Sequence, residues 1–465
     1  MFLRKRRSGG KNDLKKAIGL IFMLYATVLA GQCWDGVQGG TVSAVGLRQD
    51  GTIWTWGLDD NGQLGTAESG NALYPSPSDG GPGWLSVSMQ RHCIIALKSD
   101  GTIWGWGLNQ YGQATGDVGE ASVVVPTQIG TNQDWQQVIA GSNQSYAIRT
   151  DGTLWGWGDN TEGELGTGNY NAAGVPTQIG TASWLSIATG MHHIVGIQNN
   201  GTLWAWGLDS NGQLGNGSAV NTVTNTPQQI DAGTWIAVAA GGAHSLALRS
   251  DLTLWSWGNN NSGELGLGVS TPYIYVPTQV GTGNNWVQIS AGFQHTLGLK
   301  SDGSLWSWGG NANGQLGLGN TDFQNLPMRV GVDNNWVKIA AGTLSSFAMK
   351  SDNSIWAWGL NAQGQLGDGT TQDRYVPTNV TCELLSSPDR TNPQVTFYPN
   401  PATTDVHIHG LEQLDGIKVE IVDITGRKVH SGTSAHIRLE NLPRGVYIMK
   451  ITADTKQVCK KFVKS

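Results

Sequence analysis

The chain has 465 residues and a formal net charge of −6, and its charges are unevenly distributed. Residues 1–30 carry a net charge of +6 and residues 390–465 a net charge of +4, which leaves −16 for the long segment between them. This middle segment has only ten lysines and arginines, whereas affinity for nucleic acids depends on clustered cations and on the release of counterions. The charge distribution therefore disfavours nucleic acid as a partner.

The N-terminus has the pattern of a secretory signal. Seven lysines and arginines between residues 4 and 16 precede an uncharged stretch from Ala17 to Ala30. These fourteen residues are too few to span a bilayer comfortably, but they suit the apolar region of a signal peptide. We expect residues 1–30 to be a signal peptide, and the mature chain to have no transmembrane segment.

A motif with three tryptophans follows and occurs seven times. Two of the tryptophans form W-x-W-G, whose copies start 49–51 residues apart, and the third lies 20 residues before each pair. All 21 tryptophans of the chain, from Trp34 to Trp358, fall on these three positions. A period near 50 that is repeated seven times indicates one supersecondary unit stacked on copies of itself.

The copy at residues 286–330 shows what one unit encodes. It contains the β-rich runs WVQISAG and HTLGLK, the pair Asp302-Gly303, the run SLWSW and a short fourth run that ends at Val330. An Asp-Gly pair between two strands predicts a two-residue type I′ hairpin turn, because both turn residues need positive φ. Four strands in about 50 residues is the content of a propeller blade.

The tryptophans also indicate how the units pack. Trp306 and Trp308 are two residues apart, so they share one face of their strand, and neither face of this strand carries a charge. Both faces are therefore expected to be covered by neighbouring sheets. We predict an all-β fold in which residues 31–381 form a seven-bladed β-propeller, with closure by pairing of segments from both ends of the ring.

These residues resemble the regulator-of-chromosome-condensation repeat family. The resemblance rests on the phrases G-x-[LI]-W-x-W-G-x-N-x-x-G-[QE]-L-G-x-G, V-P-T-Q-[IV] and A-G-x-x-H-[ST], and it covers residues 34–380. It implies a seven-bladed propeller. The family includes a nucleotide exchange factor with a hairpin inserted in one blade, but the copy lengths here leave no room for such a hairpin. It also includes a plant photoreceptor with tryptophans at variable positions, but the variable positions of this chain contain no tryptophan.

Two residues in each copy vary while their surroundings are held. They lie between a near-fixed glycine and the histidine position, and the pairs are Thr41-Val42, Arg91-His92, Ser142-Asn143, Met191-His192, Gly242-Ala243, Phe293-Gln294 and Thr343-Leu344. Variable loop positions on a rigid scaffold are typical of a binding surface; the alternative is that they are unconstrained loop positions. The candidate binding residues are Arg91, His92, Ser142, Asn143, Met191, His192, Phe293 and Gln294.

Other conspicuous residues have structural explanations. Six cations occupy one repeat position, one per blade beside the Asp turn, and are interpreted as structural: Arg48, Lys98, Arg149, Arg249, Lys300 and Lys350. His193, His244 and His295 each begin a strand, where a hydrogen bond to the neighbouring backbone would explain them, and Cys93 takes the same position and is expected to be buried.

No metal or cofactor site is predicted. His407 and His409 are expected to point the same way along a strand, but two histidines without a third ligand are a weak metal signal. Cys33 precedes the first repeat and Cys382 follows the last. Because an exported protein permits disulfides and ring closure would bring the two ends together, this pair is a candidate disulfide.

After Val380 the composition changes. Residues 382–394 form a Ser/Pro-containing linker, and the alternating runs in residues 395–465 predict a small Ig-like antiparallel β-sandwich. The motifs YPNP, DITGR and LPRGVY and the closing lysines resemble the C-terminal sorting domain of the type IX (Por) secretion system of Bacteroidetes. The resemblance implies contact with that machinery, passage through the periplasm, and release or attachment at the outer cell surface. An ordinary Ig-like accessory domain is the alternative.

Two functions of different classes fit these features. The first is an exported or cell-surface propeller that binds a protein or a glycan through variable blade loops. The second is a secreted polysaccharide hydrolase or lyase with an acidic site over the propeller channel. Two carboxylates with raised pKa values in the channel would favour the enzyme, but no nucleophile–base–acid set stands out in the sequence. We favour binding and leave the catalytic residues unknown.

Overall fold

The chain is described from a computed structural model, which covers residues 34–67, 70–218 and 222–380 and, nearer the C-terminus, residues 396–398, 403–409, 418–423, 428–434, 436–439, 442–453 and 456–464. It divides into two compact units, Met1–Thr381 and Cys382–Ser465. The regular elements of the described residues are strands, and none of these residues forms a helix long and apolar enough to cross a membrane. The expected signal peptide at residues 1–30, the linker at residues 382–394 and the candidate disulfide Cys33–Cys382 lie outside the described residues.

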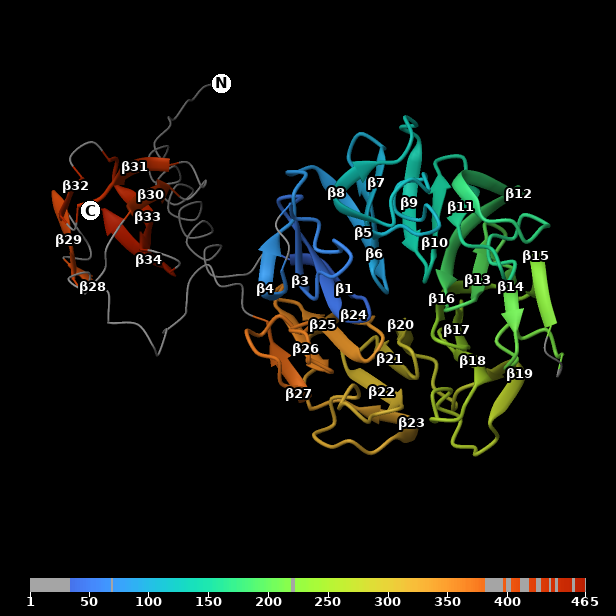
Figure 1. The fold of residues 1–465 in the computed structure, drawn as a ribbon. Helices are drawn as coiled ribbons and strands as arrows, with labels where there is room; N and C mark the ends of the chain where they lie inside the picture. The colour runs from blue at the N-terminus through green and yellow to red at the C-terminus, as the bar shows by residue number, and fades with distance from the viewer. Residues whose placement is uncertain are drawn as a thin grey trace, which may run out of the picture. The chain divides into compact units, whose positions relative to one another are not determined.

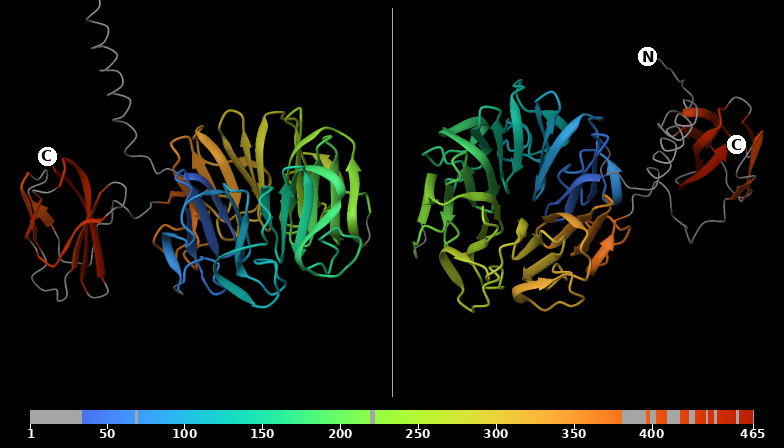
Figure 2. Two further views of the ribbon diagram at one scale, coloured as in Figure 1. Left: turned by 90° about the horizontal axis from the view of Figure 1, so that it is seen from above. Right: turned by 180° about the vertical axis from the view of Figure 1, so that it is seen from behind.

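The first unit is a ring of seven antiparallel blades around a central axis, as predicted (Figure 1 and Figure 2). In each blade the strands follow chain order from the innermost, which begins at a tryptophan, to the outermost. Blades 1 and 2 contain β1 (Trp34–Gly39), β2 (Ser43–Arg48), β3 (Ile53–Gly57), β4 (Ala72–Pro77), β5 (Trp84–Gln90), β6 (Cys93–Lys98), β7 (Ile103–Leu108) and β8 (Ser122–Gln128). Blades 5, 6 and 7 contain β16 (Trp235–Ala240), β17 (His244–Arg249), β18 (Leu254–Asn259), β19 (Tyr273–Gln279), β20 (Trp286–Ala291), β21 (His295–Lys300), β22 (Leu305–Gly309), β23 (Gln324–Arg329), β24 (Trp336–Ala341), β25 (Ser345–Lys350), β26 (Ile355–Gly359) and β27 (Arg374–Asn379).

Blades 3 and 4 share one long strand. Their strands are β9 (Trp135–Ala140), β10 (Gln144–Arg149), β11 (Thr153–Gly158), β12 (Ala173–Thr189), β13 (His193–Gln198), β14 (Leu203–Asp209) and β15 (Thr222–Asp231). The first half of β12 pairs with β11, and its second half, from Trp184 onward, pairs with β13. β12 therefore supplies the outermost strand of blade 3 and the innermost strand of blade 4, which makes the two blades one continuous sheet.

One hydrogen bond recurs at every junction between blades. The indole N–H of the second tryptophan in each W-x-W pair donates to the backbone carbonyl of the Gln or Glu in the G-[QE]-L-G turn of the preceding blade. The seven bonds measure 2.7–3.2 Å and join Trp56 to Gln365, Trp106 to Gln63, Trp157 to Gln113, Trp206 to Glu164, Trp257 to Gln213, Trp308 to Glu264 and Trp358 to Gln315. These indoles are fully buried, so each bond satisfies a donor that water cannot reach.

The same contact closes the ring between blades 7 and 1. Trp56 donates to Gln365 and packs edge-on against Phe347, with ring centroids 6.5 Å apart. In the described part of the chain, no strand from the N-terminal end joins the sheet β24–β27. The prediction that closure pairs segments from both ends is therefore wrong, because blade 1 packs face to face on blade 7 as every other pair of blades does.

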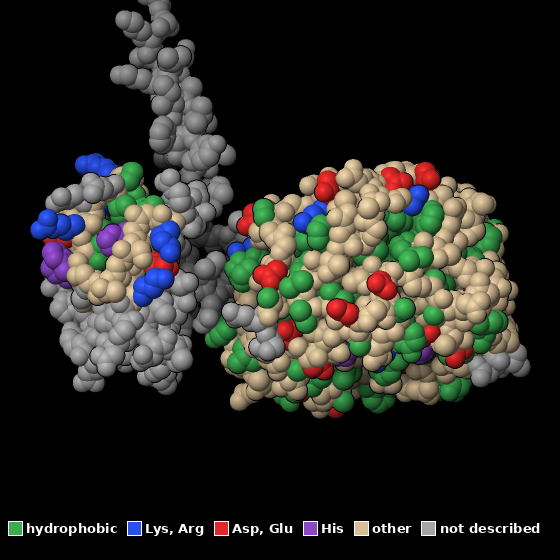
Figure 3. All heavy atoms as spheres, turned by 45° about the horizontal axis from the view of Figure 1, so that its top comes forward, with side chains coloured by type: hydrophobic (Ala, Val, Ile, Leu, Met, Phe, Trp, Pro, Cys, Tyr) green, Lys and Arg blue, Asp and Glu red, His purple; other side chains and the backbone are tan. Residues whose placement is uncertain are grey.

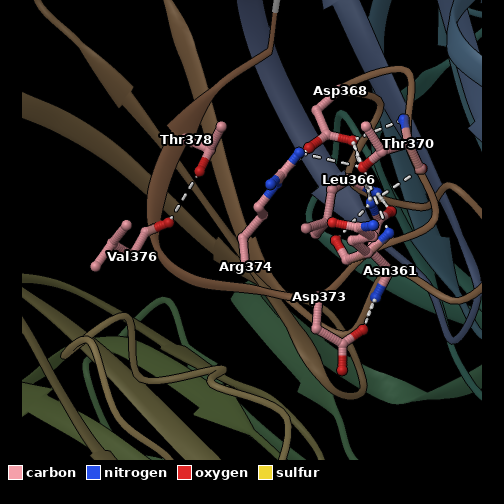
Figure 4. Close-up of polar contacts among 9 residues, drawn as sticks. Asn361, Leu366, Asp368, Thr370, Asp373, Arg374, Val376 and Thr378 are labelled. Atoms are coloured by element: carbon pink, nitrogen blue, oxygen red, sulfur yellow. Dashed lines mark hydrogen bonds and ion pairs between the residues drawn. The ribbon is translucent and has the colours of Figure 1, made fainter.

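A buried asparagine fixes the turn that supplies these carbonyls. In blade 7, Asn361 Oδ1 accepts from the backbone N–H of Leu366 at 3.0 Å, and Asn361 Nδ2 donates to the carbonyls of Thr370 and Gln372, each at 3.0 Å (Figure 4). Asp368 lies 2.6 Å from Arg374 in the same loop. Asn109, Asn160, Asn260 and Asn311 make equivalent bonds in their blades. The asparagine of W-x-W-G-x-N thus fixes the turn in a position where its Gln or Glu carbonyl can accept the hydrogen bond from the indole of the next blade.

The hairpin turns differ from the predicted type. In blade 6 the N–H of Gly303 donates to the carbonyl of Lys300 at 2.9 Å, and Gly303 has φ of +76°. Asp302 is not among the described residues with positive φ, which rules out type I′. The loop is a type I turn followed by a left-handed glycine. Asp302 stabilises it by accepting from the N–H and hydroxyl of Ser304.

The six repeated cations lie between tryptophans, in agreement with the structural interpretation. Each is placed 3.6–5.0 Å from the ring centroids of the first tryptophan of its blade and the first of the W-x-W pair. In blade 4 this position holds Gln198, which is paired with Trp184. Cation–π attraction therefore contributes to six blades and is missing from one.

The C-terminal unit contains two antiparallel sheets. One is formed by β28 (Thr396–Tyr398), β29 (Asp405–His409) and β32 (His436–Arg438), and the other by β30 (Lys418–Asp423), β31 (Lys428–Gly432), β33 (Gly445–Ala453) and β34 (Lys456–Lys464). Val406, Ile408 and Ile437 of the first sheet share one buried cluster with Val419 and Ile421 of the second. Two sheets around a common core agree with the predicted sandwich.

Replacing Leu252 with glycine should stabilise the propeller. Leu252 occupies the left-handed turn position of blade 5 with φ of +64°, which costs a non-glycine residue roughly 1–2 kcal/mol. Because glycine also has more freedom in the unfolded chain, at a cost of about 0.4–1 kcal/mol, we expect Leu252→Gly to raise the free energy of unfolding by about 1 kcal/mol in a denaturant titration. Gly201 occupies the same turn position in blade 4, so the reverse change Gly201→Leu should lower the free energy of unfolding. If the two variants unfolded with the same free energy, the turn assignment would be contradicted.

Blade 4 should accept the missing cation. We expect Gln198→Arg to raise the free energy of unfolding by about 0.5–1 kcal/mol, the usual value of a partly exposed cation–π contact. Lys300→Gln should lower it by a similar amount, because it gives blade 6 the composition of blade 4. A thermal unfolding series would test both, and a destabilising Gln198→Arg would show that this site is not equivalent to the other six.

Candidate functional site

The innermost strands enclose a cavity along the axis of the ring. It has a volume of about 750 Å³ and is lined by strands of all seven blades. Most lining residues are small or aliphatic, such as Val37, Ala140 and Ile289. Asp35 is the one carboxylate among the described lining residues, and it lies 3.5 Å from the ammonium group of Lys338. The facing carboxylates that would favour an enzyme are thus not found among the described residues of this lining.

The variable pairs meet at one end of this cavity, which we call the loop mouth. It lies where each innermost strand turns into the second strand of its blade. The first residue of every pair lines the cavity: Thr41, Arg91, Ser142, Met191, Gly242, Phe293 and Thr343. The candidates Arg91, Ser142, Met191 and Phe293 are therefore brought together, although Ser142 is only 2% exposed and offers little surface.

The second residues of the pairs are anchored through their backbones. Their carbonyls accept hydrogen bonds of 2.7–3.0 Å from the residue after each W-x-W-G, and the acceptors are Val42, His92, Asn143, His192, Ala243, Gln294 and Leu344. A backbone carbonyl makes this bond whatever the side chain is. The fold therefore fixes the position of these residues and leaves their side chains free to vary.

Backbone hydrogen bonds also join the loops of adjacent blades. The N–H groups of Thr41, Met191, Gly242, Phe293 and Thr343 donate to carbonyls of the next loop in the ring at 3.0–3.4 Å. No corresponding bond joins blades 2, 3 and 4 in the part of the chain that the structure describes. Backbone hydrogen bonds therefore connect the loops of the loop mouth around most of the ring, with a gap between blade 2 and blade 4.

Side chains bridge this gap, and the sequence interpretation missed them. Thr189 Oγ1 donates to Gln90 Oε1 at 2.8 Å, and Gln90 Nε2 donates to the carbonyl of Thr189 at 3.3 Å, which links blade 2 to blade 4. Gln90 stands where the other six copies have glycine, and Thr189 stands where most have alanine. These two departures from the repeat are the sequence features from which the contact could have been predicted.

Cys93 explains why position 90 can carry a side chain. In blades 4, 5 and 6 a Cβ on the equivalent glycine would lie 2.1–2.2 Å from the ring of His193, His244 or His295. Blade 2 has the smaller Cys93 in place of the histidine. Cys93 is free and buried, as expected, and burial raises the pKa of its thiol to about 12, so it is unreactive at neutral pH.

The three repeat histidines are structural, but their partner differs from the predicted one. His193 Nε2 lies 2.9 Å from Ser245 Oγ of the next blade, and Ser245 donates its proton to the carbonyl of Gln213 at 2.8 Å. His193 Nε2 must therefore carry a proton and donate it to the hydroxyl. Burial lowers the pKa of His193 and His244 to about 3. The bond thus joins two blades through a hydroxyl and not through the backbone.

One sector of the loop mouth is polar. His192 Nδ1 lies 3.1 Å from Glu164 Oε1, whose side chain is 1% exposed, and this hydrogen bond raises the pKa of His192. Arg91 Nη1 lies 3.5 Å from Asn143 Oδ1. Arg91 also has a φ of +49°, a conformation that is uncommon outside glycine and concentrates at functional sites.

His92 belongs to the same sector but is less exposed. Its Nδ1 lies 3.4 Å from Gln63 Nε2 and 3.9 Å from Asp60 Oδ1, and burial lowers its pKa. His92 and His192 therefore both contact the Gln or Glu of the G-[QE]-L-G turn in the preceding blade. The polar sector, defined as Arg91, His92, Asn143 and His192, combines donors and acceptors in blades 2–4.

The other sector of the loop mouth is apolar. Phe293 is 38% exposed. Gly242 of the neighbouring blade makes room for it, because a Cβ there would lie 2.7 Å from the phenyl ring. Leu344 of blade 7 also lines the cavity, whereas Gln294 is not among the lining residues. An exposed aromatic residue thus stands across the ring from the polar sector.

The opposite mouth has a different character. The residue after the first tryptophan of a blade is an exposed aliphatic side chain in five blades: Leu85, Leu185, Ile236, Val287 and Val337. The two other blades have Asp35 and Gln136 at this position, so this ring is mostly aliphatic, while the loop mouth mixes charged, amide and aromatic groups. Figure 3 shows one face of the molecule. On the propeller in this view, acidic side chains are scattered and basic ones are few, which agrees with the negative net charge of the segment between residues 30 and 390.

Comparisons with known proteins identify both parts of the chain. The family model of the regulator of chromosome condensation (RCC1) repeat matches residues 50–89, 100–148, 151–197, 200–248, 253–299, 302–349 and 352–389. The model of the secretion system C-terminal sorting domain matches residues 396–465. The matched repeat at residues 100–148 spans the two outer strands of blade 2 and the two inner strands of blade 3, so the sequence repeat joins neighbouring blades covalently.

Similar proteins are functionally diverse. The chain is 27% identical over 297 residues to the ultraviolet-B receptor UVR8 of Arabidopsis thaliana, and this alignment covers 62% of this chain and 67% of the receptor. It is 30% identical over 295 residues to the human E3 ubiquitin-protein ligase HERC2, of which it spans 6% while 61% of this chain is covered.

Solved structures show the same fold. Prp20p of Saccharomyces cerevisiae matches with a TM-score of 0.64 at 23% identity, covering 76% of this chain and 90% of that protein. Human WBSCR16 matches with a TM-score of 0.63 at 22% identity, covering 71% and 94%. The matches to the two family models show that the chain belongs to the regulator of chromosome condensation repeat family, as an exported seven-bladed propeller that carries a secretion-system C-terminal sorting domain.

Proposed function

We propose that this protein is an exported binding propeller that captures a protein or glycan ligand at the loop mouth. The observation that carries the proposal is the gathering of all seven variable pairs around one end of the channel, on backbones that hydrogen bonds hold in place. A preformed, rigid concave surface binds with a smaller entropic cost than a flexible one.

The chemistry of the loop mouth favours a ligand with both polar and apolar groups. Arg91, Asn143 and His192 supply hydrogen-bond donors and acceptors on one side, and Phe293 supplies an aromatic face on the other. Sites of this kind, mostly apolar with a few placed polar groups, are the usual form of ligand pockets. Sugar residues and peptide side chains both present this combination.

The alternative is a polysaccharide-active enzyme. It would need two carboxylates that face each other across the channel, one of them with a raised pKa. The described lining offers Asp35, which is paired with Lys338. This arrangement supports the binding proposal over the enzyme.

The sorting domain supports delivery of the propeller by the type IX machinery, and we propose a route through the periplasm to the medium or the outer cell surface. The signal-like residues 1–30 would direct the first step. The ligand would then be an extracellular or cell-surface molecule, such as a host glycoprotein, a polysaccharide or another secreted protein.

Variation of the loop mouth should weaken capture without unfolding the ring. We expect a variant with Arg91→Asn, His92→Asn, Phe293→Asn and Gln294→Ala to keep its melting temperature and to bind ligand at least about tenfold more weakly, a loss of about 1.4 kcal/mol or more. Binding would be measured on the full mature chain with a glycan array and with extracts of cell-surface and culture-medium proteins.

A matched variant controls for surface changes in general. Leu85→Asn, Leu185→Asn, Ile236→Asn and Val287→Asn alter four exposed residues at the opposite mouth and should leave capture unchanged. Trp308→Ala, in contrast, should reduce stability by about 3–5 kcal/mol, as large core truncations do. If the loop-mouth variant binds normally while the opposite-mouth variant does not, the site has been placed on the wrong face.

Deletion of residues 395–465 should separate export from folding. The propeller has its own core and its own closing contacts, so we expect the truncated chain to fold and to accumulate inside the outer membrane. Cell fractionation with a protease-protection assay would locate it. Normal appearance of the truncated chain in the medium would contradict export through the C-terminal domain.

A further inference from the structure

The C-terminal domain brings together three metal-binding side chains that are separated in the sequence. β29 and β32 are neighbouring antiparallel strands, and their register places His407 opposite His436 and Asp405 opposite Arg438. Val406 and Ile437 between them are buried in the core. Because side chains alternate along a strand, Asp405, His407 and His436 lie together on the outer face of this sheet.

The three side chains are close enough to share one ion. Asp405 Oδ2 lies 3.3 Å from His436 Nε2. The rings of His407 and His436 are stacked, with centroids 4.2 Å apart and an interplanar angle of 9°. One ligand atom from each of the three residues lies within 4.8 Å of the other two.

This donor set matches a first-row transition metal. Two imidazoles and one carboxylate are ligands of zinc sites that keep a further position for water, with bonds of about 2.0–2.2 Å. Such bonds put tetrahedral ligand atoms roughly 3.3–3.5 Å apart. The two imidazole rings are parallel in this structure, so they would have to rotate about their side-chain bonds until a lone pair of each points at the same ion. Imidazole ligands favour transition metals such as zinc over the hard cations calcium and magnesium, which prefer all-oxygen sites.

We propose that Asp405, His407 and His436 form a zinc site on the outer face of the sorting domain. The sequence pattern pointed only to His407 and His409, a pair without a third ligand. The strand register supplies the missing ligands from β32 and from two residues earlier in β29. The side chain of His409 lies outside the described residues.

Arg438 sets an upper limit on the affinity. It lies opposite Asp405 on the same face of the sheet, and its positive charge opposes the approach of a dication. Zinc should therefore bind more tightly to an Arg438→Gln variant than to the unaltered chain. A cluster that only formed an ion pair between Asp405 and His436 would not show this response.

Calorimetric titration of the full mature chain, without an affinity tag, with zinc chloride at pH 7.5 tests the proposal. We expect one site per chain, weakened by more than about tenfold in His407→Gln and in His436→Gln, because loss of even an outer-shell partner often costs that much. His430→Gln, which changes a histidine of β31 in the other sheet, should bind as the unaltered chain does.

A direct measurement covers the case in which a variant folds poorly. Nuclear magnetic resonance of the unaltered chain should show the imidazole signals of His407 and His436 shifting together as zinc is added, while those of His430 stay in place. Zinc binding that survives the double variant His407→Gln/His436→Gln, or imidazole signals that do not respond to zinc, would overturn the proposal.

Discussion

The structure depends on one contact, the hydrogen bond from a buried indole to the carbonyl of the preceding blade. Its acceptor is shared: the carbonyl of Gln213, for example, accepts from both Trp257 and Ser245. At the next junction the carbonyl of Glu264 accepts from Trp308 and Thr296. Two donors on one carbonyl hold adjacent blades at a fixed offset. Because the junction between blades 7 and 1 uses the same bond, the ring needs no shared strand to close.

This contact also shapes the candidate site. In two blades the Gln or Glu that accepts the indole bond also contacts a variable residue through its side chain: Glu164 lies beside His192, and Gln63 beside His92. At these two positions a residue that holds the blades together therefore also supports a variable side chain. A rigid scaffold under variable positions is how loop-based binding surfaces achieve both stability and diversity.

The repeat made most of the fold predictable. Twenty-one tryptophans at three positions indicated seven four-stranded blades, and the described strands agree with them. Details that depend on local dihedral angles were not accessible: Asp302-Gly303 suits two turn types, and only the φ values separate them. The mode of closure was also missed, because the sequence shows where strands lie but not which faces meet.

The candidate site was predictable as a set but not in its arrangement. Variation in seven pairs marked the loop mouth, whereas the roles within a pair, with Met191 lining the channel and His192 resting on Glu164, depend on the direction of each loop. The brace between Gln90 and Thr189 was visible only as two exceptions to the repeat. In the C-terminal domain, His436 joined His407 through a strand register that no local motif encodes.

The most direct test of the central claim, that the loop mouth is the binding surface, is hydrogen–deuterium exchange on the mature chain with and without its captured ligand. We expect protection in the loops between the first and second strands of the blades, above all at residues 89–93, 141–144 and 190–193, with the outer strands unchanged. Protection confined to the ring of Leu85, Leu185 and Ile236 at the opposite mouth, or to the outer strands, would contradict it.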